Sequence, residues 1–188
     1  MEKLSPGDIR VGDRYEEIRG EARRGVAELK RHRRVTLGDQ LALVFENRET
    51  IRSALEELVR AEHVTDPDRL AGDVGAFNAL IPPAGALGAT LYLEIADPAD
   101  LAVAASHLQG VEACVYLEVA GTTTKAQPEI VTAPDEAAPA YYLSFPLSAE
   151  QRHAWLSGGE VVAGVDHAAC SVRVSLDEQQ RRAIAADF

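Results

Sequence analysis

The sequence predicts an α+β protein with a mostly antiparallel or mixed sheet, helices packed on one face, and a ferredoxin-like split β-α-β core. Three observations support this class: alternating strand patterns, helical stripes between them, and two strand–helix–strand passages in succession after Gly88. The 188 residues suit one compact unit. Residues 1–86 would form N-terminal helices and a β-hairpin packed on a core of residues 87–188.

The N-terminal part predicts three helices and a hairpin. Asp13 can cap a helix that runs to about Arg33, because apolar residues recur there at helical spacing. Residues 35–37 and 41–46 flank a short turn and predict a hairpin. Asn47 can cap the next helix, and Asp66-Pro67 begins another that ends before Pro82.

The sequence of residues 87–188 predicts the two strand–helix–strand passages. A strand at 91–95 precedes a helix capped by Asp97 and a second strand at 111–119. Residues 120–139 contain three prolines and predict a long connection with little core. The remaining elements are then strand 141–147, helix 148–156 capped by Ser148, strands 161–165 and 171–176, and a final helix capped by Asp177.

Composition and charge argue against membrane-spanning, secreted and nucleic-acid-binding proteins. The longest apolar runs are far shorter than the roughly 20 residues of a membrane span, and no signal-peptide pattern begins the chain, so we expect a cytoplasmic protein without a membrane partner. The formal net charge of −11 argues against nucleic-acid binding. Residues 1–34 carry 10 basic and 7 acidic side chains, or +3, which leaves −14 for the rest. We expect the basic helix to pair with the acidic body.

Cys114 and Cys170 are too few for a disulfide framework. Strand parity puts them on opposite sheet faces, as two ordinary thiols.

The chain has no recognised catalytic or nucleotide-binding motif. The most informative segment is residues 45–50, where an apolar strand meets a helix among charged groups. Glu57 and Arg60 are three residues apart on that helix, and Glu62 extends its apolar stripe. A structural ion-pair network and a ligand site both remain open for this region. The candidate ligand-binding residues are Glu46, Arg48, Glu57, Arg60, Glu62 and Asn78.

A metal ion is the only cofactor that the sequence leaves open. No two histidines have the spacing of a helical metal site, so ligands would have to come from separate elements. The candidate ligands are Glu62, His63, Asp166 and His167. Two simpler roles compete: His63 as a cation at a helix C-terminus, and Asp166-His167 as a turn between strands.

Several segments together resemble an uncharacterised bacterial family, domain of unknown function 3501. They are KRHRRVTLG (30–38), FENRET (45–50), ELVRAE (57–62), FNALIP (77–82) and VDH (165–167). The resemblance spans nearly the whole chain and implies a redox or metal-related setting, because members are often encoded near rubrerythrin-like and iron–sulfur oxidoreductase genes. It brings no catalytic residues. Ala54, Glu56 and Phe77 depart from the pattern, which expects glutamines at the first two positions and a tyrosine at the third.

These observations favour an accessory or binding protein. Its partners would be proteins, redox proteins among them, and a homo-oligomer is compatible with the sequence. The alternative is a metal- or small-ligand-dependent enzyme that uses a charged cluster around Arg48, Glu57 and Arg60.

Overall fold

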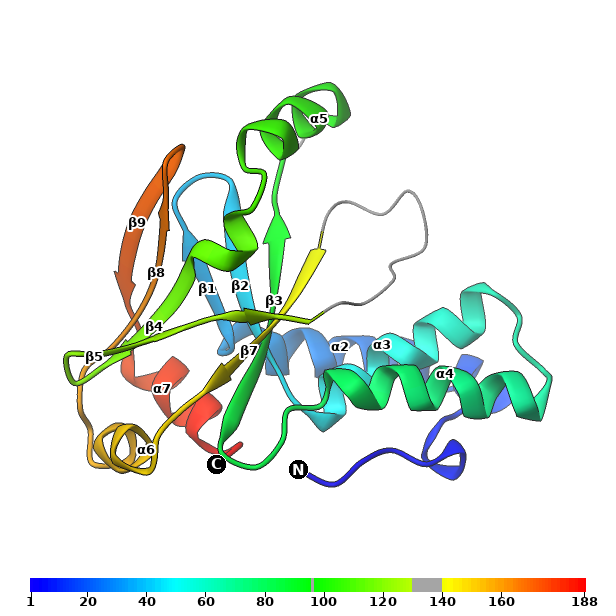
Figure 1. The fold of residues 1–188 in the computed structure, drawn as a ribbon. Coiled ribbons are helices and arrows are strands. Elements are labelled where there is room, and N and C mark those ends of the chain that lie inside the picture. Colours follow the sequence, from blue (N-terminus) through cyan, green and yellow to red (C-terminus); the bar gives the residue numbers. More distant parts are fainter. Residues whose placement is uncertain (96, 130–139) are drawn as a thin grey trace.

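A computed structural model describes residues 1–95, 97–129 and 140–188 (Figure 1). Part of the predicted connection, 130–139, therefore lies outside the described residues. The helices are η1 (Pro6–Asp8), α1 (Asp13–Glu16), α2 (Arg19–Arg31), α3 (Arg48–Ala61), α4 (Pro67–Leu80), α5 (Pro98–His107), η2 (Val111–Cys114), α6 (Ala149–Leu156) and α7 (Glu178–Ala185). The strands are β1 (Arg34–Leu37), β2 (Leu41–Glu46), β3 (Ala86–Leu93), β4 (Val115–Val119), β5 (Thr122–Lys125), β6 (Gln127–Pro128), β7 (Ala140–Pro146), β8 (Val161–His167) and β9 (Cys170–Ser175).

The described strands form two antiparallel sheets, which confirms the α+β class. Sheet A has the order β1-β2-β3-β7-β6, and sheet B has the order β5-β4-β8-β9. The chain passes from sheet B to sheet A at Ala126, which separates β5 from β6 and donates its amide to the Val115 carbonyl at 2.9 Å. The two sheets enclose the larger hydrophobic core, which we call the inter-sheet core.

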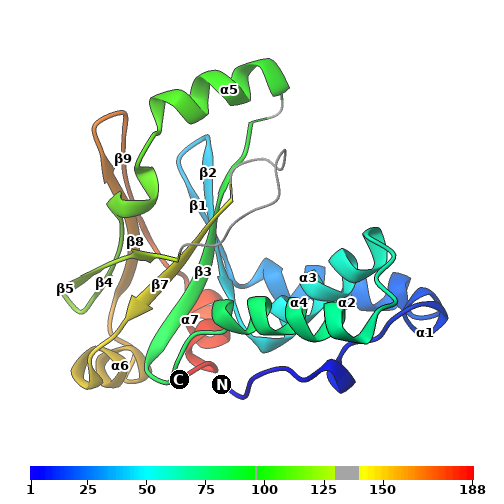
Figure 2. The ribbon, with the colours of Figure 1, turned by 45° about the vertical axis from the view of Figure 1, so that its right-hand side comes forward.

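The ferredoxin-like split core was a wrong expectation. The two strand–helix–strand passages exist, but each leaves one sheet and enters the other: β3–α5–β4 and β7–α6–β8. A split β-α-β core would keep these strands in one sheet. The helices also do not share one face. Helices α2 to α4 lie beside sheet A, α6 and α7 lie at one end of the sheets, and α5 lies at the other end (Figures 1 and 2).

Sheet A is covered on both sides and sheet B on one. Every residue of β2 is buried. Leu41, Leu43 and Phe45 enter the inter-sheet core, and the opposite face of the sheet lies toward the helices. There a second cluster, the helix core, gathers Ile51, Leu55 and other residues of the first 81 positions. In sheet B, burial alternates along β4 and β9, so its outer face is open.

The predicted caps on α3, α4, α6 and α7 are confirmed, whereas Asp13 is the first residue of α1 and Gly12 holds its N-cap position. Asn47 Oδ1, for example, accepts hydrogen bonds from the amides of Glu49 and Thr50 at 3.1 Å. Asp66, Ser148 and Asp177 cap their helices in the same way.

Some boundaries differ from the prediction. The first helix breaks between α1 and α2, β3 begins earlier at Ala86, and the predicted connection contains β5 and β6. The predicted turn at Asp166-His167 was also misplaced. These residues end β8, where they pair with Ser171 and Cys170, and the turn follows them. Both cysteines are free thiols.

The hairpin β1–β2 is part of sheet A rather than an appendage. Strand β2 pairs with β3 over six positions, from Leu41–Leu93 to Glu46–Gly88, and this pairing crosses the expected boundary at residue 86. Within the described residues, no helix is both long and apolar enough to cross a bilayer.

Candidate functional site

Glu57, on α3, binds the part of the chain from Leu4 to Arg19, which we call the N-terminal segment. The Tyr15 hydroxyl donates to Glu57 Oε1 at 2.8 Å, and Arg19 donates through two nitrogens at 2.9 Å. The Arg19 guanidinium lowers the pKa of the Glu57 carboxyl. Burial, followed by the hydrogen bond to Glu57, raises the pKa of Tyr15 to about 12. The expected partner Arg60 instead binds Glu16, with Nε and Oε1 2.6 Å apart.

Arg48 and Asn78 also bind the N-terminal segment. Arg48 Nη2 lies 3.0 Å from Asp8 Oδ1, and hydrogen bonds from Ser5 and then from Arg48 lower the pKa of Asp8 to about 2. The Asn78 side chain accepts from the Leu4 amide at 2.7 Å and donates to the Leu4 carbonyl at 2.9 Å. These contacts are separate pairs along one segment, so the structure does not bring the candidate residues together in one cavity.

The sequence analysis did not identify a more buried ion pair, between Arg10 and Glu56. Glu56 is fully buried, and Arg10 binds both of its carboxylate oxygens at 2.7 Å while donating its own amide at 3.1 Å. Helical projection gave no signal for this pair, because Glu56 lies off the apolar stripe of Ile51 and Leu55.

The candidate metal ligands lie apart. Glu62 pairs with Arg69, and His63 is exposed just beyond α3. Asp166 and His167 end β8 on the opposite side of the molecule (Figure 1). His167 Nε2 lies 3.2 Å from the Gln109 carbonyl oxygen. Among the described residues, no three His, Cys, Asp or Glu side chains form a group that could hold a metal ion.

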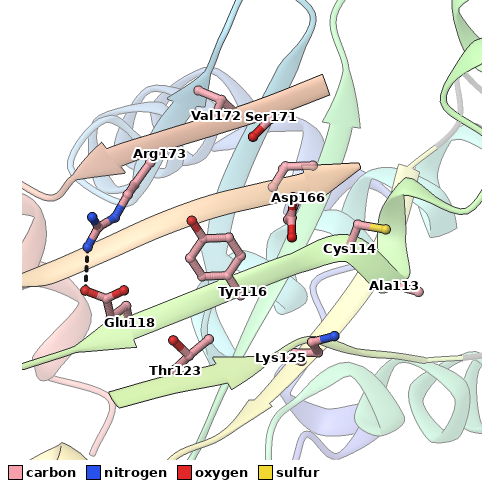
Figure 3. Close-up of a pocket in the computed structure, with 11 residues that line it drawn as sticks. Ala113, Cys114, Tyr116, Glu118, Thr123, Lys125, Asp166, Ser171, Val172 and Arg173 are labelled. Atoms are coloured by element: carbon pink, nitrogen blue, oxygen red, sulfur yellow. Dashed lines mark hydrogen bonds and ion pairs between the residues drawn. The ribbon is translucent and has the colours of Figure 1, made fainter. Parts of the chain in front are cut away.

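The open face of sheet B carries a groove of about 500 Å³, which we call the sheet B groove. Outward-facing side chains from all four strands, with η2, line it (Figure 3). They include Cys114, Tyr116, Glu118, Thr123, Lys125, Asp166, Ser171 and Arg173.

Tyr116 lies at the middle of the sheet B groove, with its ring across β8 (Figure 3). Gly164 makes this position available, because a Cβ at residue 164 would overlap the ring. Glycine inside a strand often marks such a close approach. An ion pair between Arg173 and Glu118 closes one end, and Lys125 and Asp166 lie toward the other (Figure 3). The groove therefore offers one aromatic surface among polar groups of both charges.

Of the groove residues, the sequence analysis had singled out only Asp166 as a candidate. Alternation along β4 places Tyr116 and Glu118 on the same face of the strand. Nothing in the sequence revealed that β5 and β9 flank β4 and β8 on one open sheet.

A family model for a "protein of unknown function (DUF3501)" matches residues 3–188. The chain belongs to the DUF3501 family. A crystal structure of a novel protein of unknown function from Burkholderia pseudomallei K96243 has the same fold, with a TM-score of 0.92, 24% identity and full coverage of both chains. No functionally curated protein matched the chain. The DUF3501 assignment confirms the resemblance, and the fold agrees with a solved structure, but neither names an activity.

Proposed function

We propose that this DUF3501 protein is a non-catalytic accessory protein that binds a protein partner through the sheet B groove. The observation that carries the proposal is Tyr116, which lies flat on Gly164 in the middle of an uncovered sheet face. Tyrosines held in one orientation by packing are common anchors of protein interfaces, because they lose little conformational freedom on binding.

The shape of the groove favours a protein partner. Small-molecule sites are usually concave cavities that bury most of their ligand. The sheet B groove is instead an open surface, with Thr123, Lys125, Ser171 and Arg173 around its aromatic centre. This arrangement resembles the apolar centre and polar rim of a protein interface. Redox proteins are the first partner class to test, because the family resemblance implies a redox or metal-related setting.

The alternative enzyme around Arg48, Glu57 and Arg60 has less support. Each of these side chains binds a different residue of the N-terminal segment: Asp8, Arg19 with Tyr15, and Glu16. A substrate would have to displace these ion pairs.

The test has two steps. A photo-crosslinking residue at Thr123, inside the groove, should capture a partner that the same residue at Val103 does not. Val103 is a matched control because it is 55% exposed on α5. With the purified partner, Tyr116→Ser should weaken binding at least about tenfold in calorimetry, as expected for an anchor residue, and Val103→Ser should leave it unchanged. Equal affinity of the two variants would overturn the proposal.

A further inference from the structure

Helix α2 is amphipathic, but its apolar stripe is only half covered. The stripe begins at the N-cap Ile18 and continues with Ala22, Val26 and Leu29 at helical spacing, yet none of the 13 residues of α2 is buried. Each of the other described helices of eight residues or more buries at least one side chain. A groove of about 490 Å³ lies between the stripe and α3, and we call it the α2–α3 groove. A single chain therefore leaves apolar surface of α2 in contact with solvent.

Ion pairs fix which side of α2 faces the rest of the chain. Arg19 donates to Glu57 on α3 through two nitrogens at 2.9 Å, and Lys30 Nζ lies 3.5 Å from Glu46 Oε1 on β2. Both cations lie on the same side of the helix. The opposite side is exposed and carries four charged residues: Glu21, Arg24, Glu28 and Arg31.

Gly25 lies between this charged side and the apolar stripe. It is exposed and lines the α2–α3 groove, and a Cβ at this position would meet no described atom within 4 Å. Glycine in the interior of a helix is less stable than alanine. Packing within the chain does not require this glycine, whereas the close approach of another backbone would.

The charges on the exposed side alternate in sign along the helix. Suppose that two α2 helices pack antiparallel about a two-fold axis at Val26. Residues at equal distances from Val26 then face each other, so Glu21 faces Arg31 of the second copy and Arg24 faces Glu28 of the second copy. Every acidic side chain meets a basic one, so this side of α2 is complementary to itself. Glu21 and Arg24 have no ion-pair partner among the described residues, and Glu28 pairs only at the surface, with Arg31 and His32.

We propose that two copies of this chain form a dimer through α2, with the helices antiparallel and Gly25 close to the point of nearest approach. A second copy fits this surface better than an acidic or a basic partner, because acidic and basic groups alternate in equal number. The net charge of −11 makes two copies repel each other at a distance, so their contact needs such local pairing. Sheet B lies away from α2, so the dimer would leave the sheet B groove open (Figure 2).

Sedimentation velocity of the full chain tests the dimer at concentrations up to about 100 µM. We expect a concentration-dependent dimer in the wild type. Gly25→Gln places a long side chain at the nearest approach and should raise the dissociation constant at least about tenfold. Glutamine favours helix, so the fold of each chain is retained. The matched control is Gly72→Gln on α4, another exposed glycine with no atom within 4 Å of its Cβ position, and it should leave the dissociation constant unchanged.

A charge exchange tests the antiparallel pairing. Glu28→Arg sets two basic groups against each other, because Arg24 of the second copy faces this position, and should also weaken the dimer at least about tenfold. The double variant Arg24→Glu/Glu28→Arg restores opposite charges in reverse order and should recover most of the affinity. A dimer that Gly25→Gln leaves intact, or no recovery in the double variant, would overturn the proposal. A monomeric wild type would also overturn it and would leave the α2–α3 groove to a different protein.

Discussion

At the scale of single residues, the charged side chains of α3 act as attachment points for the N-terminal segment. Arg10 with Glu56 is the most buried of these pairs, with side-chain exposures of 27% and 0%. The two partners are not equivalent. Loss of Glu56 leaves an arginine that can reach water, whereas loss of Arg10 leaves a carboxylate enclosed without its cation.

We therefore predict that Arg10→Met lowers the free energy of unfolding by about 3 kcal/mol. The double variant Arg10→Met/Glu56→Met should recover part of this loss, because no buried charge remains. Urea unfolding measures both values. Arg182→Met is the control, since its pair with Glu178 is exposed on α7 and should contribute no more than about 0.5 kcal/mol. A similar cost for Arg10→Met and Arg182→Met would contradict the prediction.

The raised pKa of Tyr15 predicts that the stability of the fold depends on pH in the alkaline range. Its pKa is raised to about 12 in the folded state, against an ordinary value of 10.0. Between these values the unfolded chain loses the phenolic proton and the folded chain keeps it. The stabilisation is therefore complete below pH 10 and disappears as the pH rises toward 12.

We expect the unfolding free energy of the wild type to fall by about 2 kcal/mol more than that of Tyr15→Phe over this range. Denaturant titrations at several pH values test the difference in slope, and other alkaline titrations cancel because both proteins share them. Parallel slopes would show that the Tyr15 hydroxyl is not held as described.

At the scale of elements, Gly164 in β8 and Tyr116 in β4 form one packing unit. A Cβ at residue 164 overlaps the Tyr116 ring, so Gly164→Ala must displace the ring or bend the strands. Overpacking of this kind costs about 1–3 kcal/mol. In the Tyr116→Ser background the same substitution should cost less than about 0.5 kcal/mol, since the ring is gone. Chemical denaturation of the four proteins gives the coupling energy, and additive effects would disprove the contact.

At the scale of elements, the sequence predicted individual helices and strands well and their arrangement into sheets poorly. Local signals located the hairpin at residues 34–46 and the caps at Asn47, Asp66, Ser148 and Asp177, because turns and caps depend on neighbours in the chain. Local signals could not show that β3 and β4 lie in different sheets. A strand–helix–strand pattern looks the same whether its strands share a sheet or connect two.

For the candidate site, too, local sequence signals could not identify contacts with distant parts of the chain. The segment around Asn47 was correctly identified as rich in charged contacts, but the partners of those charges lie about 40 positions earlier in the chain, as with Arg19 and Glu57. Helical projection places a side chain on a face, and it does not say which distant segment covers that face. The sheet B groove is harder still, because four strands from two distant parts of the chain form it.

At the scale of the whole molecule, β2 joins the two hydrophobic cores. Phe45 belongs to the inter-sheet core, and the next residue, Glu46, points to the opposite face, beneath the helices. The helix core draws on the first 81 residues and Tyr142, whereas the inter-sheet core contains Trp155. Because the hairpin strand β2 pairs with β3 across residue 86, we expect the two cores to unfold together rather than as separate domains.

A single substitution in the helix core tests this cooperativity. Leu55→Ala removes a fully buried side chain of α3 and should cost about 2–5 kcal/mol. Trp155, the only tryptophan, reports on the distant inter-sheet core by its fluorescence. If the cores are coupled, the denaturation midpoints from tryptophan fluorescence and from far-ultraviolet circular dichroism fall by the same amount, with an unchanged slope. If residues 1–86 unfold independently, the circular dichroism midpoint falls and the fluorescence midpoint stays where it is in the wild type.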